Sequence, residues 1–360
     1  MKSTRITAVL WCVMVLFFYI TEDSLFAGLT LFTTAGVLAL SGILTAAGGR
    51  KCSLTVLAPE NIGKDEDLFV DIKLDNRSLL PVCRYSVLLR CANILTGEEI
   101  EVPAVLSAGA RKTAKVRMRL EEEFCGYVTY GTKEARVSDP LHLFTARRKA
   151  AAQACTYIMP EIRELALDPE ELNAYDMESY IYSAAQKGND PSETFGIREY
   201  VQGDSPKTIH WKLTGKMGDV VVRELGLPVE NSIMILMDKR LVKGETLAPK
   251  LRHRATELFL SLSNTLLGKE MSHSVGWQSY KTGQFIIRRV TCREELWAVC
   301  GLLLESPYME DIASTAVRYL ETEGDRRYAN YLYVTAGRDP DEVRLEGYGA
   351  VTVYRAENYK

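Results

Sequence analysis

Two uncharged, apolar runs at the start of the chain constrain its fold more than any other feature. Residues 6–21 carry no charge, and after Glu22 and Asp23 residues 24–49 are uncharged again. A transmembrane helix needs about 20 apolar residues, so the second run is long enough, while the first is short unless Arg5 extends to the interface. The pattern predicts a transmembrane helical hairpin over residues 1–50, in contact with membrane lipid through residues 6–47.

A cleaved signal peptide is the alternative for the first run, because Lys2 and Arg5 give it a basic start. No clear A-x-A site follows it, and a second apolar run begins at once, which favours two spans. Arg50 and Lys51 flank the second run, whereas the turn between the runs holds only acids. The positive-inside rule then places both ends, and the bulk of the chain, on the cytoplasmic side of the cell membrane.

Composition narrows the remaining possibilities. The length of 360 residues allows two or three domains, and a net charge of −3 predicts no bulk attraction to nucleic acid. Eight cysteines are scattered with no C-x-x-C pair, so neither a disulfide framework nor a zinc site is indicated. We interpret the cysteines as small buried hydrophobic residues.

Residues 51–146 have the pattern of β-structure. Val70, Ile72 and Leu74 alternate with charged residues, and residues 115–120 alternate in the same way. Short strands of this kind, separated by turns, predict an all-β sandwich. We expect residues 147–195 to form a linker and a mobile loop, because a polar stretch from 186 to 194 has Gly-Asn-Asp-Pro at its centre.

From residue 229 the pattern changes to alternating strands and helices, which predicts a mostly parallel sheet covered on both faces. A continuous apolar strand ends at Asp238, and a helix follows with leucines at helical spacing. Further strands are expected at 275–277, 285–287, 331–334 and 351–354, and further helices at 296–304 and 312–320.

Residues 196–224 form an unusual segment that joins these regions. Gly203 permits a tight turn, Asp204 is a candidate helix N-cap, and the apolar Val220–Val222 run predicts a strand. Arg198 and Asp204 are expected to form a partly buried ion pair. We expect Trp211 to be buried and the segment to lock the short helix and the strand onto the α/β sheet.

The same segment resembles the signature of the domain of unknown function 58 family, R-E-Y-x-x-G-D-x-x-R-x-I-x-W-K. The matching residues are Arg198, Glu199, Tyr200, Gly203, Asp204, Ile209, Trp211 and Lys212. The resemblance implies that residues 196–360 hold the signature and a von Willebrand factor A-like α/β domain. It also implies a MoxR-type AAA+ ATPase as partner. A second match, to the family's D-P-F-G-L-F step, has His142 in place of the glycine.

The resemblance raises the question of a metal, because von Willebrand factor A-like domains can bind one through D-x-S-x-S. Here Asp238 is followed by Lys-Arg-Leu-Val, so both hydroxyl ligands are missing and two cations take their place. Hard divalent cations need several oxygen ligands. We therefore expect no metal and no cofactor, with Asp238 as a degenerate position.

Two classes of function follow. The favoured one is a membrane-anchored cytoplasmic scaffold that works with an AAA+ ATPase in assembly or maturation of a cell-envelope or protein complex, with no catalytic residue. The alternative is a hydrolase-type enzyme that uses polar residues of the signature, namely Arg198, Glu199, Asp204 and His210. The four histidines are scattered, and the common nucleophile and phosphate-loop motifs are absent.

Overall fold

The computed structural model describes residues 2–359 except 23, 65, 168–181, 202–203, 229–232, 245, 324–327 and 338–341. The chain divides into two compact units, Met1–Pro160 and Glu161–Lys360.

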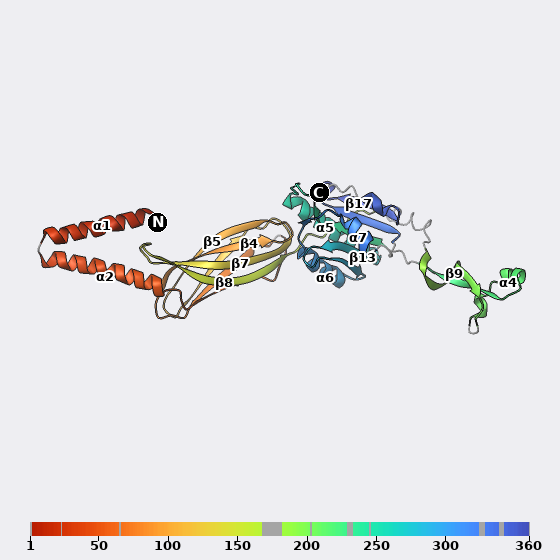
Figure 1. Cartoon of the computed structure of the whole chain (residues 1–360), viewed down its shortest axis with the longest axis horizontal. Helices are drawn as coiled ribbons and strands as arrows, with labels where there is room; N and C mark the ends of the chain where they lie inside the picture. The colour runs from red at the N-terminus through yellow and green to blue at the C-terminus, as the bar shows by residue number, and fades with distance from the viewer. Residues whose placement is uncertain are drawn as a thin grey trace. The chain divides into compact units, whose positions relative to one another are not determined.

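Two helices open the first unit. They are α1 (Lys2–Thr21) and α2 (Leu25–Ala47), and they lie side by side as an antiparallel pair (Figure 1). Ser24 caps α2 by accepting a hydrogen bond from the Ala27 amide at 3.2 Å. Both helices are long and apolar enough to cross a membrane, as expected for the hairpin. That they span a membrane, with both ends on the cytoplasmic side, stays a prediction.

The end of α2 is held by an arginine from the following domain. The guanidinium of Arg148 donates to the carbonyl oxygens of Thr45, Ala46 and Gly48 at 3.2, 2.7 and 3.1 Å. The last carbonyls of a helix have no partner within it, and a cation is favourable at that end. Gly49, at φ +73°, continues the chain so close to Val137 that a Cβ atom there would lie 2.7 Å from Cγ2.

The rest of the first unit is a β-sandwich, as predicted. One sheet has the order β1-β3-β6 and the other β2-β8-β7-β4-β5, and one apolar core lies between them. Val70, Ile72 and Leu74 are fully buried in that core. The strands are β1 (Cys52–Leu57), β2 (Asn61–Ile62), β3 (Leu68–Asn76), β4 (Val82–Asn93), β5 (Glu99–Ala108), β6 (Thr113–Leu120), β7 (Gly126–Ser138) and β8 (Thr145–Ile158).

The expected linker over 147–195 is wrong at both ends. Strand β8 runs through the expected boundary at 146 and pairs along most of its length with β7. Strand β8 is rich in alanine and lacks the large apolar residues that would have predicted a strand, yet it pairs with β7. At the other end, residues 182–199 form strand β9 instead of a loop. The part of the expected loop at 168–181 lies outside the described residues.

The second unit contains the predicted α/β sheet, in the order β14-β13-β11-β16-β17. All neighbours are parallel except β14, which is an antiparallel edge. The strands are β11 (Ile233–Asp238), β13 (His273–Ser279), β14 (Gln284–Val290), β16 (Asn330–Thr335) and β17 (Ala350–Arg355); the helices are α5 (Pro249–Gly268), α6 (Arg293–Leu304) and α7 (Thr315–Glu323). Helix α7 begins three residues later than the expected 312.

Helices cover both faces of this sheet. Met234 and Leu236 of β11 pack in one cluster with Ala316 and Tyr319 of α7. Successive residues of a strand point to opposite faces. On the other face Trp277 lies edge-on to Phe259 of α5, with 6.5 Å between ring centroids. Every residue of β11 is buried, as its continuous apolar sequence predicts.

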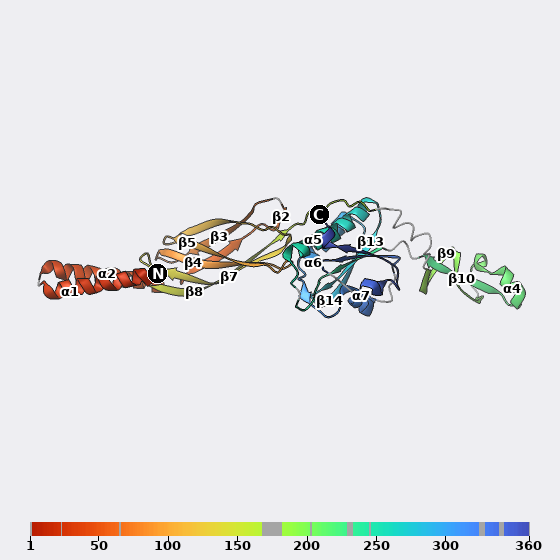
Figure 2. The ribbon, with the colours of Figure 1, turned by 90° about the horizontal axis from the view of Figure 1, so that it is seen from above.

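The signature segment forms a separate arm, which we define as residues 182–228. Strand β9 (Tyr182–Glu199) pairs antiparallel with β10 (Val221–Pro228) in a two-stranded sheet. Between them lie a 3-10 turn, η1 (Pro206–Thr208), and a short helix, α4 (Trp211–Met217), at the far end of the arm (Figures 1 and 2). The expectation that the 220–222 strand joins the α/β sheet is therefore wrong.

Candidate functional site

The predicted ion pair between Arg198 and Asp204 forms in the arm, next to the end of β9. Arg198 donates from both terminal nitrogens to the two carboxylate oxygens of Asp204, each at 2.7 Å. The same carboxylate accepts from the Val201 amide at 2.9 Å, and the Asp204 amide donates back to the Val201 carbonyl. Bidentate pairs of this kind fix geometry as well as contributing energy. The pair therefore sets the turn that leads from β9 to η1.

The helix caps differ from the expectation. Ser205 caps η1, and His210 caps α4, where its Nδ1 accepts from the Leu213 amide at 3.3 Å. Asp204 caps neither element, because its carboxylate is already occupied by Arg198 and Val201. His210 is therefore a capping side chain. Gly203 lies outside the described residues.

Burial in the arm is the reverse of the expectation for Trp211. This side chain is 69% exposed, whereas Val221 and Val222 of β10 are buried. Trp211 is the first residue of the short helix α4, and the described part of the arm is a two-stranded sheet that leaves this side chain uncovered. Among the arm residues whose side chains the structure describes, five large apolar ones are exposed: Ile197, Tyr200, Val201, Trp211 and Val220.

The remaining signature residues do not assemble a catalytic cluster. Glu199 and Lys212 are exposed, and Ile209 is half-buried and forms a β-bridge with Val222. Of the four residues of the hydrolase hypothesis, Arg198 and Asp204 bind each other, and the imidazole of His210 is directed to the backbone of α4. An acid–base pair needs side chains that converge on a substrate position, and these contacts are internal to the fold.

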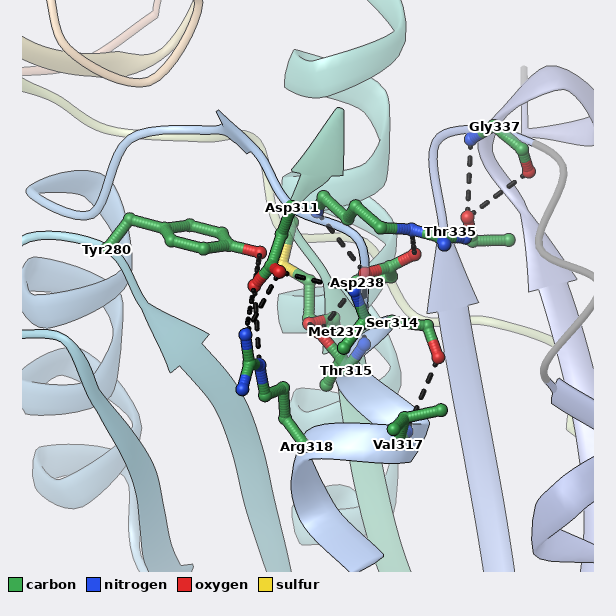
Figure 3. Close-up of polar contacts among 12 residues, drawn as sticks. Met237, Asp238, Tyr280, Asp311, Ser314, Thr315, Val317, Arg318, Thr335 and Gly337 are labelled. Atoms are coloured by element: carbon green, nitrogen blue, oxygen red, sulfur yellow. Dashed lines mark hydrogen bonds and ion pairs between the residues drawn. The ribbon is translucent and has the colours of Figure 1, made fainter. Parts of the chain in front are cut away.

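A second polar cluster lies at the carboxyl end of β11. The sheet order places β11 at the point where strand order reverses, and in doubly wound sheets ligands bind at that point, outside the carboxyl ends of the strands. Asp238 ends β11 and pairs in register with Thr335, which ends β16. Its Oδ1 accepts from the amide and the hydroxyl of Thr315, at 3.3 and 3.1 Å, and from the Arg240 amide at 3.2 Å (Figure 3).

The neighbouring Lys239 turns away from this edge. Its side chain is fully buried, and Nζ donates to the carbonyls of Leu303 and Ser306 at 2.5 and 2.6 Å. Leu303 lies in the last turn of α6, where a cation is favourable. Lys239 therefore stabilises the end of α6, and it does not occupy the position of a missing hydroxyl ligand.

Asp311 and Arg318 complete the cluster. Arg318 donates to both carboxylate oxygens of Asp311 at 3.0 and 3.2 Å, and the Tyr280 hydroxyl donates to the same carboxylate at 3.2 Å (Figure 3). Burial acts to raise the pKa of Asp311, but hydrogen bonds from Arg318 and the Ala313 amide outweigh it and lower the pKa. Burial, together with the charges of Asp311 and Asp238, raises the pKa of Tyr280.

This cluster is satisfied by its own members. Both carboxylates accept several hydrogen bonds from within the chain, and no group of three His, Cys, Asp or Glu side chains suited to a metal occurs in the described part of the chain. Sequence reasoning found Asp238 but missed Thr315, Asp311, Arg318 and Tyr280. The Asp-Ile-Ala-Ser-Thr run before α7 was the available signal, since such residues favour a helix N-terminus.

Comparison with known proteins adds little. No family model and no curated protein matches the chain. Among solved structures, a CARDB domain from Pyrococcus furiosus is similar over 30% of this chain and 87% of its own, at 11% identity and a TM-score of 0.23. A cohesin module from Clostridium perfringens is similar over 31% of this chain and 98% of its own, at 10% identity and a TM-score of 0.23. Similarity this low carries no argument, so the β-sandwich rests on the strand pairings above.

The arm and the strand edge thus differ in what they offer. The strand-edge cluster has its charges paired within the fold, which makes it a structural network. The arm has a bidentate ion pair between Arg198 and Asp204 and exposes aromatic and aliphatic side chains. Exposed apolar groups on a well-fixed framework are typical of a surface that binds another protein. We take the arm as the candidate functional site.

Proposed function

We propose that the protein is a membrane-anchored cytoplasmic scaffold whose arm binds a protein partner. The observation that carries the proposal is the 69% exposure of Trp211 on an arm fixed by the Arg198–Asp204 pair. Tryptophan and tyrosine are enriched among the residues that dominate binding energy at interfaces. Two apolar helices at the start of the chain would anchor the scaffold.

The proposal includes membership of the domain of unknown function 58 family, with a von Willebrand factor A-like second unit. The signature residues of 198–212 support the first part. The strand order supports the second, because β11 is central, β13 and β14 lie to one side of it, and β16 and β17 to the other. This corresponds to the first five strands of the 3-2-1-4-5-6 order of doubly wound sheets, with β14 antiparallel.

We further propose a MoxR-type AAA+ ATPase as the partner, on the family resemblance alone. The test is co-purification of the full chain, in detergent, with the MoxR-type ATPase of the same organism. Trp211→Ala should weaken the complex by at least about 30-fold, as expected for an interface residue worth about 2 kcal/mol. Because Trp211 is exposed, the heat-unfolding midpoint should stay close to that of the unmodified chain.

Trp297→Ala is the matched control, since Trp297 of α6 is also exposed, at 47%, but lies outside the arm. It should leave the complex intact. Equal binding by both variants and the unmodified chain would contradict the arm as the docking site. Loss of a cellular phenotype in Arg198→Ala and His210→Ala, with binding and folding unchanged, would instead favour the hydrolase alternative.

A further inference from the structure

A basic cleft lies at the end of the sandwich that adjoins the end of α2. It has a volume of about 570 Å³ and is lined by Arg5 of α1, Arg84 of β4, Arg136 of β7 and Arg147 of β8, and by His142 from the turn between β7 and β8. The other lining residues carry hydroxyl groups: Thr4, Ser86, Ser138 and Thr145. The described residues that line the cleft are therefore hydrogen-bond donors and cations, and none of them is acidic.

The strand register brings these cations together at a cost. Arg136 of β7 pairs directly with Arg147 of β8. Two residues further along β7, Ser138 lies between Arg84 of β4 and Thr145 of β8. Like charges directly opposite on neighbouring strands destabilise a sheet. Such an arrangement is relieved when an anion binds between the guanidinium groups.

Carboxylates of the described residues leave the cations of the cleft without an ion-pair partner. Within the described residues, none of its four arginines forms an ion pair with an acid. Asp139, in the adjoining turn, is buried and accepts from the amides of Leu141 and Phe144 at 3.1 and 2.7 Å. Its carboxylate fixes the turn that presents His142, whose Nε2 lies 3.4 Å from Nη1 of Arg84.

An apolar groove adjoins the cleft. It has a similar volume, about 570 Å³, and lies between α1 and α2, where Trp11, Val37 and Leu38 line it. Thr4 lines both the groove and the cleft, and the turn contributes to both, with Leu141 and Leu143 in the groove and His142 in the cleft. The two cavities thus form a site with one cationic part and one apolar part, at the end of two helices suited to a membrane.

We propose that this site binds one anionic phospholipid, with its headgroup phosphate in the basic cleft and an acyl chain in the groove between α1 and α2. The guanidinium fork matches the oxygens of a phosphate. Anionic lipids are attracted to basic residues next to membrane helices. A soluble phosphate would satisfy the arginines but leave the groove unused, so the groove commits the site to a lipid. The inference is independent of the arm and of its partner.

The test measures lipid binding by the delipidated full chain in detergent, using phosphatidylglycerol, phosphatidylcholine and inorganic phosphate as probes and native mass spectrometry as the readout. The variant R84Q/R136Q/R147Q removes the cleft charges. Each basic residue near a membrane surface contributes roughly fivefold in affinity, so the triple variant should bind phosphatidylglycerol about 100-fold more weakly. Phosphatidylcholine binding should change little.

The matched control is R90Q/R117Q/R119Q, which removes the same charge from exposed arginines elsewhere in the sandwich. Arg117 and Arg119 lie near Leu120 of β6, which pairs with Leu68 at one end of β3. Cys52, which follows α2, pairs with Asn76 at the opposite end of β3. These two arginines therefore lie at the end of the sheet away from α2. This control should keep its lipid. Ala8→Phe, which narrows the groove, should weaken lipid binding while the cleft arginines are unchanged.

Three results would overturn the proposal. Equal losses in the cleft variant and the control would show general charge attraction. Full retention of phosphatidylglycerol by R84Q/R136Q/R147Q would show that the cleft does not hold the headgroup. Inorganic phosphate that binds as tightly as phosphatidylglycerol, with no effect of Ala8→Phe, would show a soluble anion site in place of a lipid site.

Discussion

Replacement of Asp238 by alanine tests whether the strand-edge cluster is structural. Asp238 is 4% exposed, and its Oδ1 accepts from the Thr315 amide, the Thr315 hydroxyl and the Arg240 amide. The hydroxyl has a second acceptor in the Met237 carbonyl at 3.1 Å, so its loss is small. The two amides lose their side-chain acceptor, at about 1–3 kcal/mol for each buried donor left unsatisfied.

Arg240 adds to this loss, because its Nε lies 3.9 Å from Oδ2 and both side chains are nearly buried. We therefore expect Asp238→Ala to lower the free energy of unfolding by roughly 3 kcal/mol. A domain of this size shifts its unfolding midpoint by about 2–4 °C per kcal/mol, which predicts a decrease of about 6–12 °C. Asp238→Asn keeps an Oδ1 acceptor for Thr315 and should cost less than half as much.

Trp277 provides the readout, since it is fully buried against α5 in the same sheet. Heat unfolding of the full chain in detergent is followed by its fluorescence, in a background with Trp11, Trp211 and Trp297 replaced by Phe. An unchanged or higher midpoint in Asp238→Ala would refute the reasoning. The carboxylate would then be held at a cost to stability, as functional residues often are.

Four other measurements follow from the structure. A double-mutant cycle of Arg198→Ala and Asp204→Ala should show a coupling of about 1 kcal/mol in the hydrogen-exchange protection of the Tyr200 and His210 amides. These amides donate to the carbonyls of Val220 and Val221. Additive effects of the two substitutions would contradict the ion pair as the contact that stabilises the arm. Calorimetry of the full chain should show no magnesium or manganese binding that Asp238→Ala removes; saturable binding lost in that variant would contradict the prediction. The exposed thiol of Cys155 should resist a membrane-impermeant maleimide in intact cells, whereas a cysteine at Glu22 should react, and the reverse pattern would invert the topology. Burial, helped by the charge of Glu98, raises the pKa of Glu122 from 4.5 to about 7. Between these pH values the native sandwich holds a proton that the unfolded chain releases, so stability should fall as pH rises from about 4.5 to 7. Glu122→Gln should remove this pH dependence of the heat-unfolding midpoint.

Periodicity in the sequence predicted the parts whose burial is regular. Val70, Ile72 and Leu74 identified a half-buried strand, and the continuous run before Asp238 identified a strand buried on both faces. Two uncharged apolar runs predicted α1 and α2. In each case the burial of one face, or one uniform environment around the whole element, determines the order of apolar and polar residues. The local sequence is then enough to predict the element.

The failures share a different cause. Trp211 is large and apolar, and such residues usually lie inside, but whether a second layer covers it depends on a partner outside the segment. Asp204 is a good cap by type, yet Arg198 on the preceding strand captures it first, through a contact that residue preference cannot show. Strand β8 was missed because alanines at its buried positions gain their stability from β7.

The contact between Arg148 and the end of α2 has a consequence for synthesis of the chain. The carbonyls that Arg148 caps belong to residues 100–103 positions earlier, so α2 leaves the ribosome long before its cap exists. Until β8 joins β7, the last turn of α2 must rely on water or headgroups for those carbonyls. In the membrane-anchored protein that we propose, completion of the sandwich is then the step that fixes the register of α2 relative to the membrane surface.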